Sequence, residues 1–439
     1  MSTRSAEFDF VLVGGGLQSG LIALALRYHR PDVSIAMVEQ ASSLAGNHTW
    51  SFHETDVPDD AVGWLAPLNE YKWSGYEIAV GGLSKSVEIG YRSVSSVHFA
   101  KVVERSLMGS HQVDAETESA TCKILLDARV VHCTPKTVLM ADGRSLKAKC
   151  VVDCRGPRRD EGFDEKRFPG GFQKFWGFEL QLPSDWLSTR PIIMDDRVEQ
   201  EDGFRFFYTL PFGPRRILVE DTRFSNNPLI HRADCFLQVD RYLRSMSHGR
   251  LSIERCEIVR EESGVLPMPY RGSMPDANGT IMAGGYRGGW CHAATGYSFP
   301  MAVQFAQCLA MNSINELPIA VTHLVQRNRW QARFSRLLNR LLFRLVSPRT
   351  RYQIFRRFYR VLSDDQIARF YSHRFSLGDA VRIIVGIPPT GLRPLDFMKS
   401  FFDRESYPKT LDPGDAGVVE STGSIQSTKE SARGKEVIS

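Results

Sequence analysis

The pattern of apolar and polar positions changes once along this chain. A strand–helix–strand pattern comes first, and a pattern of antiparallel strands follows it. Residues 8–13 and 33–38 are short apolar runs rich in β-branched side chains, as in the buried strands of a parallel sheet. Between them, residues 17–30 place apolar side chains at helical spacing on one face. After residue 170 the pattern becomes that of antiparallel strands, which alternate or run apolar over residues 172–182, 204–210 and 216–220.

The same rhythms assign most of the remaining elements. Residues 97–110 are helical in period, and residues 124–131, 137–140 and 145–152 are predicted strands around an Ala141-Asp142-Gly143 hairpin turn. A late strand ends in glycines at residues 280–285, and a helix over 299–311 follows, with Pro300 in its first turn. Strand, glycine turn and helix therefore occur twice, once near each end of the first predicted unit.

These patterns predict four regions. A nucleotide-binding domain of the strand–helix–strand type takes residues 1–160 and 266–315, with an insertion near 54–95. A β-rich lobe takes residues 161–265, and a basic helical region takes 316–400. Residues 410–439 are mostly Gly, Ser, Thr, Lys and Glu, which predicts a disordered tail.

Composition narrows the class of protein. The chain has 439 residues, 42% hydrophobic and 24% charged, with a net charge of +5, which is typical of a folded soluble or peripheral protein. No run of about 18 uncharged apolar residues is present, and no apolar signal region precedes the first strand, so we expect a cytoplasmic protein. The eight cysteines are scattered without metal-ligand spacing, so no metal site is predicted.

The first glycine turn carries the clearest chemistry. Gly14 allows a sharp turn after the strand, Gly15 follows it, and Gly16 lacks the Cβ that would keep a pyrophosphate from the helix N-terminus. Glu39 lies 25 residues after Gly14, near the spacing of an acid that binds a ribose hydroxyl. The third position departs from the fingerprint, because Ser19 stands there and Gly20 follows. We predict an adenine dinucleotide site over the alternative of a plain strand–helix turn.

Other segments are candidates for the same cofactor site. Asn47 and His48 lie in a loop after the acid, which either covers the cofactor or is a polar loop with a packed aromatic residue. Arg155 ends an apolar strand, where a flavoprotein chain would return to its nucleotide sheet or simply turn. In adenine-dinucleotide flavoproteins a late strand–glycine–helix unit returns to the same site, so the late glycine turn is expected to contribute four further candidates: Gly284, Gly285, Gly296 and Tyr297.

The C-terminal helical region is rich in arginine. No Asp or Glu occurs between Glu316 and Asp364, and bulky apolar residues are interleaved with the arginines. This pattern favours a helix lying on an anionic membrane surface, with a solvated basic face on a core helix as the alternative. Binding to nucleic acid is not expected, because no recognition module and no strong net charge are present.

Several motifs together resemble one family, the bacterial flavin-dependent lycopene β-cyclases of carotenoid synthesis. The resemblance extends from the first strand to about residue 395. It is carried by Gly14-Gly-Gly16-Leu-Gln-Ser-Gly20, Gly46-Asn-His-Thr-Trp-Ser-Phe52, Asp153-Cys-Arg-Gly156, Pro191-Ile-Ile-Met-Asp195, Gly203-Phe-Arg-Phe-Phe-Tyr-Thr-Leu-Pro211, Leu218-Val-Glu220-Asp221-Thr222 and Thr295-Gly-Tyr-Ser-Phe-Pro300. Several of these motifs are specific to the family rather than common to flavoproteins.

The resemblance implies an α/β fold with an FAD-binding Rossmann-like domain of the glutathione reductase or p-hydroxybenzoate hydroxylase type. It implies a non-redox cyclisation of the acyclic ends of lycopene, a C40 polyene, to β-ionone rings, by way of γ-carotene to β-carotene. It also implies a requirement for reduced FAD, with NADPH as an electron donor. The implied partners are lycopene, the inner membrane surface, on which the protein would be peripheral, and other enzymes of carotenoid synthesis.

The chemistry selects the candidate acids. Protonating an alkene needs a neutral carboxyl held out of water, with a raised pKa. Glu220 and Asp221 are adjacent at the end of an apolar strand, which directs them to opposite faces; in the family this pair carries a catalytic carboxylate. Glu220 is our first candidate and Asp221 the second, and Asp195 or Glu199 could also line the site. The alternative is an acidic strand end that pairs with a nearby arginine, Arg216 or Arg223.

A carbocation is stabilised by aromatic faces and must be shielded from water. The candidates for the polyene pocket are Trp176, Phe204, Phe206 and Tyr208, although strand alternation turns about half of them elsewhere. Two other functions remain open from the sequence. One is a redox enzyme of the same fold, an FAD-dependent monooxygenase or polyprenyl reductase acting on an isoprenoid. The other is a non-catalytic membrane-bound lipid carrier.

Overall fold

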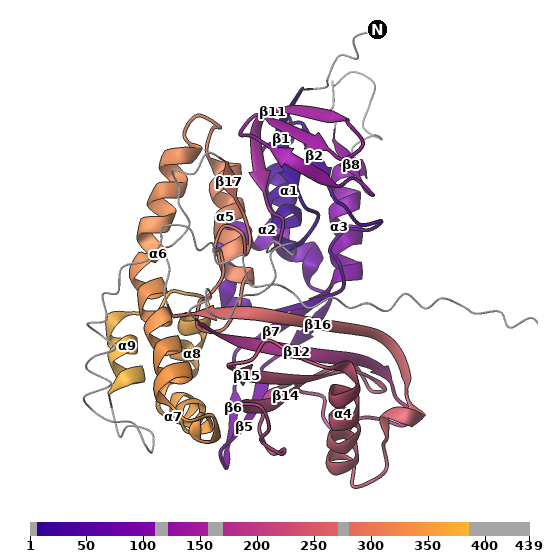
Figure 1. Ribbon diagram of the computed structural model, residues 1–439, viewed down its shortest axis with the longest axis vertical. Coiled ribbons are helices and arrows are strands. Elements are labelled where there is room, and N and C mark those ends of the chain that lie inside the picture. Colours follow the sequence, from indigo (N-terminus) through magenta and orange to yellow (C-terminus); the bar gives the residue numbers. More distant parts are fainter. Residues whose placement is uncertain (1–6, 110–121, 157–169, 271–280, 386–439) are drawn as a thin grey trace, which may run out of the picture.

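The computed structural model describes residues 7–109, 122–156, 170–270 and 281–385. The chain forms two stacked lobes, and a layer of C-terminal helices runs along one side of both (Figure 1). The predicted tail at 410–439 lies outside the described residues, as do the last residues of the predicted helical region.

A mainly parallel sheet forms the core of the first lobe. Its strand order is β8-β2-β1-β11-β10-β9, and β17 pairs in parallel with the end of β11. The β1–β2 pair is buried on both faces, as its apolar runs predicted. The bounds are β1 Glu7–Val13, β2 Ile35–Val38, β8 Lys123–Leu125, β9 Val130–Cys133, β10 Thr137–Met140, β11 Ser145–Asp153 and β17 Met282–Ala283. The predicted hairpin is confirmed, since β10 and β11 are antiparallel around Gly143, which has φ +85°.

Three helices pack beside this sheet (Figure 1): α1 (Leu17–His29), α3 (Ser96–Met108) and α5 (Phe299–Met311). The side-chain oxygen of Ser95 caps the start of α3 by accepting a hydrogen bond from the His98 amide. Gly20 lets α1 approach α3, because a Cβ there would lie 2.3 Å from the ring of Phe99. Close packing of α1 against α3 therefore depends on Gly20. This glycine comes one residue after the third glycine position of the fingerprint, which Ser19 occupies.

The second lobe is a long, mostly antiparallel sheet in the order β16-β12-β15-β14-β13-β5-β6. Helix α4 (Arg232–Met246) covers one face, and the other face looks toward the first lobe and the C-terminal helices (Figure 1). The strands are β5 Tyr76–Val80, β6 Leu83–Val87, β12 Gly170–Gln181, β13 Ile192–Asp195, β14 Phe204–Gly213, β15 Arg216–Ser225 and β16 Glu257–Pro269. Strands β5 and β6 come from the predicted insertion, so that segment contributes to the second lobe.

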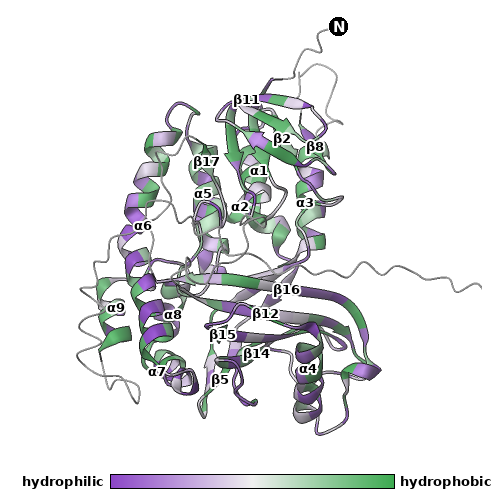
Figure 2. Cartoon of the chain, in the orientation of Figure 1, coloured by the Kyte–Doolittle hydropathy of each residue, from purple (hydrophilic) through white to green (hydrophobic). Residues whose placement is uncertain are grey.

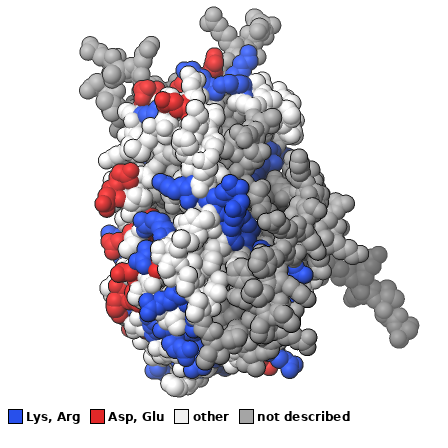
Figure 3. Space-filling model, turned by 90° about the vertical axis from the view of Figure 1, so that its left-hand side faces the viewer, with Lys and Arg blue, Asp and Glu red and all other residues white. Residues whose placement is uncertain are grey.

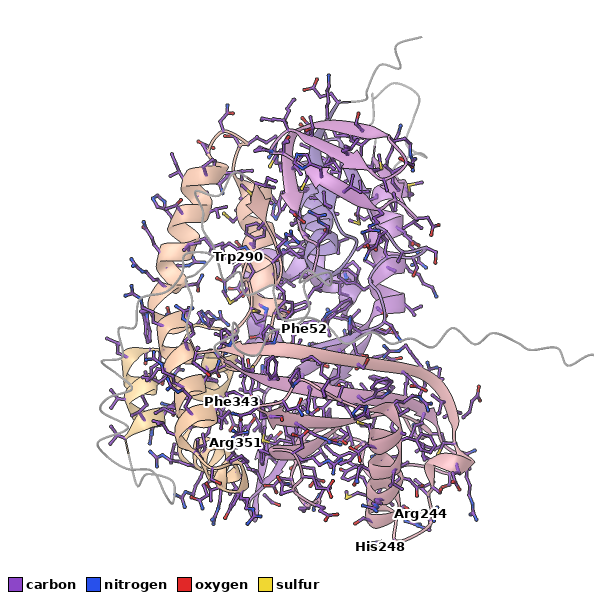
Figure 4. All side chains as sticks on the ribbon, viewed as in Figure 1. Phe52, Arg244, His248, Trp290, Phe343 and Arg351 are labelled. Atoms are coloured by element: carbon purple, nitrogen blue, oxygen red, sulfur yellow. The ribbon has the colours of Figure 1, made fainter. Side chains whose placement is uncertain are left out.

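A small sheet connects the lobes. It consists of β3 (Thr49–His53), β7 (Tyr91–Ser95) and β4 (Tyr71–Trp73), in the order β3-β7-β4. Phe52 of β3 stacks on Phe299 of α5 with ring centroids 3.9 Å apart, which anchors this sheet to the first lobe (Figure 4). Short helical turns complete this part of the fold: α2 Val62–Leu65 and the 3₁₀ turns Glu54–Asp56, Asp59–Ala61, Ala66–Leu68 and Ile253–Arg255.

The C-terminal helices run along both lobes. They are α6 (Leu317–Arg340), which continues as a π-helical turn over Leu341–Leu345, then the 3₁₀ turn Pro348–Thr350, α7 (Tyr352–Val361), α8 (Asp364–Tyr371) and α9 (Leu377–Ile384). The buried Arg351 donates to the Phe224 carbonyl at 2.9 Å and lies 5.0 Å from the ring of Phe343, which locks this layer onto the second sheet (Figure 4). Among the described residues, none of the helices combines the length and apolar character needed to span a membrane.

Candidate functional site

The first glycine turn leaves the N-terminus of α1 open. Gly14 has φ +93°, a conformation that favours glycine, and a Cβ there would lie 3.2 Å from the backbone of Arg155. Gly16 is the N-cap of α1 and makes no side-chain capping bond, and a Cβ built on it would meet no atom within 4 Å. The free amides and positive dipole end of α1 therefore face open space in which an anion can bind.

Glu39 lies beside this turn. Its Oε2 accepts a hydrogen bond from the Gly15 amide at 2.6 Å, and its Oε1 accepts one from the Ala41 amide at 2.8 Å. A Cβ at Gly15 would lie 2.6 Å from a methyl group of Leu44, so the turn packs closely against that side chain. The structure thus brings together the turn and the predicted ribose acid.

The second glycine turn meets the first through Gln18, a residue that the sequence analysis did not select. The Gln18 side chain accepts a hydrogen bond from the Gly285 amide at 3.2 Å and donates one to the Ala302 carbonyl in α5 at 3.0 Å. A Cβ at Gly284 would lie 2.6 Å from the Cys154 sulfur. A polar residue inside the glycine fingerprint was the available signal. Its buried side chain joins the two strand–turn–helix units into one site.

Arg155 pairs with the strand end before it. Its guanidinium donates to both carboxylate oxygens of Asp153, at 2.9 and 2.8 Å, and Arg287 approaches the same carboxylate at 3.0 Å. Two arginines therefore flank the end of β11, next to the glycine turn at Gly14. The predicted contact of Arg155 with the flavin stays a prediction.

Asn47 lies where the lobes meet rather than beside Glu39. Its side chain donates to the Glu261 carbonyl in β16 and accepts a hydrogen bond from Arg260 at 3.1 Å. His48 is exposed next to it, with its ring 6.2 Å from that of Trp50. The loop thus connects the first lobe to β16, and its predicted role in covering the cofactor stays a prediction.

Gly296 and Tyr297 lie at the start of α5, at the junction of the lobes. Gly296 has φ +66°, and the Tyr297 hydroxyl donates to Asp56 at 2.5 Å and accepts from the His53 amide at 3.2 Å. His53 reaches onward to the Tyr76 hydroxyl at 3.0 Å. Tyr297 therefore belongs to a polar network with Asp56, His53 and Tyr76 behind the small sheet.

These residues fit an adenine dinucleotide. Among the residues described, the N-termini of α1 and α5 both lack side-chain caps, and Gln18 joins their turns. A pyrophosphate would bind at the open N-terminus of α1, and Glu39 would bind the ribose. The fit rests on the space above Gly16, which a side chain would fill.

Glu220 lies on the inner face of the second sheet, in β15. It is half-buried, and its carboxylate accepts a hydrogen bond from the Thr222 hydroxyl at 2.5 Å. Burial, together with the charges of Glu262 and Asp221, raises the pKa of Glu220 from 4.5 to about 8. A carboxyl with this pKa keeps its proton at neutral pH, as an acid that protonates an alkene requires.

The second carboxyl at this position, Glu262, was missed by the sequence analysis. It is buried in β16, where it accepts hydrogen bonds from Thr49 at 2.9 Å and from Arg260 at 2.8 Å. Burial raises its pKa, against the opposing charge of Arg260. The acid-rich run in which it lies, Arg260-Glu-Glu262, was visible in the sequence, but only strand pairing shows that it faces Glu220.

Asp221 and Asp195 point to the opposite face, under α4. Arg205 and Arg223 donate hydrogen bonds to the fully buried Asp221, with closest distances of 2.7 and 2.8 Å, and hold its pKa below the usual range although burial opposes this. Asp195 is buried against Arg197 and the Tyr242 hydroxyl. The expected alternation between Glu220 and Asp221 is confirmed, and the structure does not bring Asp221 or Asp195 to the acid on the inner face.

Glu199 and Trp176 also lie away from Glu220. Glu199 is exposed and approaches Arg241 at 3.7 Å. Trp176 is on the α4 side of β12, where its indole nitrogen donates to Glu261 at 3.1 Å. Neither side chain shares the face that carries Glu220.

The other three pocket candidates do share that face. Tyr208 is paired with Glu220 across β14 and β15, and its hydroxyl lies 2.9 Å from that of Tyr91. Phe204 and Phe206 are buried farther along β14, where Phe204 stacks on Phe355 of α7 at 4.5 Å. Tyr208 is therefore beside the acid, whereas the two phenylalanines help to attach the C-terminal helices.

Tyrosines surround the junction that Tyr208 faces, and Tyr76 and Tyr91 among them are buried. The rings of Tyr76 and Tyr91 are 5.1 Å apart, and Tyr371 from α8 lies 5.9 Å from Tyr297. These rings come from segments far apart in the sequence, so no local pattern could have grouped them. They provide aromatic faces near Tyr208, which is paired with Glu220 across β14 and β15.

Known structures share this fold. A geranylgeranyl bacteriochlorophyll reductase-like protein from Thermoplasma acidophilum superimposes with a TM-score of 0.57, covering 90% of this chain and 99% of that one at 11% identity. A flavin-dependent brominase superimposes with a TM-score of 0.55, covering 91% of this chain and all of the other at 13% identity. The predicted fold class is confirmed: an α/β flavoprotein fold with a β-rich lobe and a helical C-terminal region.

Sequence comparison identifies the family. The sequence model described as "Lycopene cyclase protein" matches residues 9–395. A lycopene β-cyclase from Pseudescherichia vulneris is 36% identical over 391 residues, which are 88% of this chain and 95% of the relative. The chain belongs to the lycopene cyclase family.

Proposed function

We propose that the protein is a lycopene β-cyclase in which Glu220 is the acid that starts ring closure. Family membership supports the reaction and the substrate. The observation that carries the residue assignment is Glu220 itself, a carboxyl with a pKa raised to about 8 on the inner face of the second sheet. A carboxyl at its ordinary pKa would be ionised at neutral pH and could not protonate an alkene.

Glu220 would donate its proton to the terminal isopropylidene double bond of lycopene. The neighbouring double bond attacks the resulting cation and closes the ring, and loss of a ring proton leaves the β-ionone double bond. One proton enters and one leaves, so lycopene is neither oxidised nor reduced. Tyr208 and Tyr91 would present aromatic faces to the cation, and the buried surroundings would keep water from quenching it.

The cofactor in this proposal is FAD in its reduced form, with NADPH as the electron donor, and the flavoprotein fold and the fit of the glycine turns support FAD itself. The reduced form and the donor rest on the family resemblance. When bound, reduced FAD supplies an electron-rich ring that stabilises a nearby positive charge. Gly16, Glu39 and the N-terminus of α1 would hold its nucleotide part.

The test is an anaerobic assay with lycopene in liposomes and chemically reduced flavin. The wild-type protein should convert lycopene to a product of unchanged mass. Glu220→Gln should lose ring formation while retaining bound flavin. A product changed in mass would favour a monooxygenase or a polyprenyl reductase, and wild-type activity of Glu220→Gln would remove the residue assignment.

We further propose that the protein is peripheral on the cytoplasmic membrane, with α9 as its contact. Leu377, Val381 and Val385 are 72%, 59% and 65% exposed, and Figure 2 colours most of α9 as hydrophobic at the edge of the molecule. A shallow recess beside them is lined by Arg357, Arg360 and Arg382. Figure 3 shows Lys and Arg side chains gathered on this side of the molecule. Exposed apolar side chains beside arginines suit an anionic bilayer.

The arginine-rich pattern in the sequence is strongest in α6, but we place the membrane contact at α9. Arg336 of α6 is half-buried, and burial with the neighbouring Arg333 and Arg340 lowers its pKa to about 10. Replacing Leu377, Val381 and Val385 by serine should reduce sedimentation with anionic vesicles. The matched control replaces three exposed apolar residues elsewhere: Ile319, Leu229 and Leu237. Equal sedimentation of the two triple variants would refute the α9 assignment.

A further inference from the structure

Glu220 and Glu262 face each other across a position that has no side chain. In the strand pairing, Gly177 of β12 is opposite Glu220 of β15 on one side and opposite Glu262 of β16 on the other. All three residues therefore lie in one row on the inner face of the sheet, across three neighbouring strands about 5 Å apart. A Cβ at Gly177 would lie 3.2 Å from Glu262 Cγ and 3.5 Å from Glu220 Cβ.

The surroundings of the two carboxyls are unequal. Glu262 accepts hydrogen bonds from Arg260 and Thr49, and Arg260 also binds Glu179 at 2.9 Å. Glu220 accepts a hydrogen bond only from a neutral group, Thr222, among the contacts of the described residues. The positive charge near the pair is thus on the Glu262 side, which makes Glu262 the carboxyl that ionises first.

Three other charged or titratable side chains of the described residues lie near Glu220 and Glu262, and none of them replaces Glu262 as the charge facing Glu220. Asp221 adjoins Glu220 in the chain but points to the α4 face, where Arg205 and Arg223 neutralise it. Tyr208 faces Glu220 from β14, and burial raises its pKa, so it remains neutral. Glu179 lies on the far side of Arg260. Among the residues that the structure describes, Glu262 is therefore the acid on the same face whose charge acts most strongly on Glu220.

We propose that Glu262 is a positioning residue for the reaction: its carboxylate, fixed by Arg260 and Thr49, faces Glu220 across Gly177 and makes the pair hold one proton, on Glu220. This inference rests on the proposed role of Glu220 as the acid. Two carboxyls that share a site cannot both ionise at moderate pH, because like charges repel strongly in a buried environment. The proton thus remains where the substrate can receive it.

The arrangement also depends on a loop from the first lobe. Thr49 begins β3, and Asn47, two residues earlier, accepts a hydrogen bond from Arg260 at 3.1 Å. The loop that follows Glu39 therefore reaches across the lobe junction and fixes the two residues that orient Glu262. Any shift of this loop would change the charge that Glu220 experiences.

The experiment compares Glu262→Gln with Glu261→Gln in the flavin-loaded protein. Glu261 is the matched control because it adjoins Glu262 on β16 but faces α4, where it pairs with Arg232 and Trp176. Glu262→Gln removes the negative charge beside Glu220. The alkaline limb of the rate–pH profile should therefore move to a pH about one unit lower. At pH values above the wild-type limb, the variant should react about tenfold more slowly than the wild type. Glu261→Gln should leave the limb in place.

A second measurement does not need activity. The infrared carbonyl band of a protonated carboxyl that disappears in Glu220→Gln reports the protonation of Glu220 directly. This band should titrate at lower pH in Glu262→Gln than in the wild type and the Glu261→Gln control.

The outcomes distinguish this inference from the proposed function. If Glu220→Gln is inactive but the band and the limb are unmoved in Glu262→Gln, the role of Glu262 is refuted and the acid assignment stands. If Glu220→Gln cyclises lycopene like the wild type, the acid assignment fails, and Glu262 loses its role with it. A titration that moves to higher pH in Glu262→Gln also refutes the proposal.

Discussion

Raising the pH above 8 should slow cyclisation progressively by removing the proton from Glu220. With a pKa of about 8, roughly 90% of this carboxyl is protonated at pH 7, compared with roughly 0.3% for a carboxyl at its usual value of 4.5. The folded protein thus supplies roughly 300 times more of the neutral acid at pH 7 than an unperturbed glutamate would. Above pH 8 the rate should fall about tenfold per pH unit.

The same shift affects stability, with a definite sign. A carboxyl whose pKa is raised in the folded state stabilises the fold only while it is protonated, so this contribution is complete below about pH 4.5 and is lost as the pH rises through about 8. Glu220→Gln cannot ionise, and its thermal midpoint should therefore fall less than that of the wild type between pH 6 and pH 9.

The assay measures initial cyclisation rates in liposomes with chemically reduced flavin, so that the pH dependence of a reductase does not enter. Bound flavin is checked at each pH by its absorbance. A rate that stays constant to pH 10 would refute the reasoning, because the ionisation of Glu220 would then not control the rate. An alkaline limb near pH 5 would also refute it, because the carboxyl would then have an ordinary pKa.

Three further predictions follow from the geometry of the described residues. Asp221→Asn leaves the buried Arg205 and Arg223 poorly paired and should cost about 3–5 kcal/mol of folding stability, seen as a lower thermal midpoint; an unchanged midpoint would contradict the structural role. Gly16→Val should remove flavin from the purified protein while leaving its circular dichroism spectrum unchanged, because a Cβ there meets open space; retained flavin would argue against the pyrophosphate position. Gly20→Val, whose Cβ would meet the Phe99 ring at 2.3 Å, should instead lower the yield of folded protein, and a normal yield would contradict the close packing of α1 and α3.

Much of the first lobe could be predicted from the sequence because its signals are local. The buried strands, the glycine turn and Glu39 lie within one short segment. The spacing of the apolar residues there distinguishes the strands from the helix between them. The division of the acids between two faces was also predictable, since alternation along a strand separates Glu220 from Asp221. The choice of Glu220 as first candidate needed the family resemblance, and the structure adds its raised pKa.

The residues that the sequence did not reveal depend on long-range pairing. Glu262 meets Glu220 only through the register of β12 with its two neighbours, and no spacing within β16 encodes that register. Trp176 was an aromatic candidate on a strand whose phase could not be determined locally, and the pairing directs it to α4. The role of Gln18 in joining the two glycine turns depends on its hydrogen bond with Gly285, which is 267 residues away in the chain.

Reaction in deuterated water tests most directly whether Glu220 delivers a proton to the end of lycopene. Glu220 exchanges its proton with solvent, so each ring formed by the wild-type protein should carry one deuterium and weigh one mass unit more than in ordinary water. Glu220→Gln should form no labelled ring while its flavin remains bound. Rings that form without deuterium, or labelled rings formed at the wild-type rate by Glu220→Gln, would contradict the account.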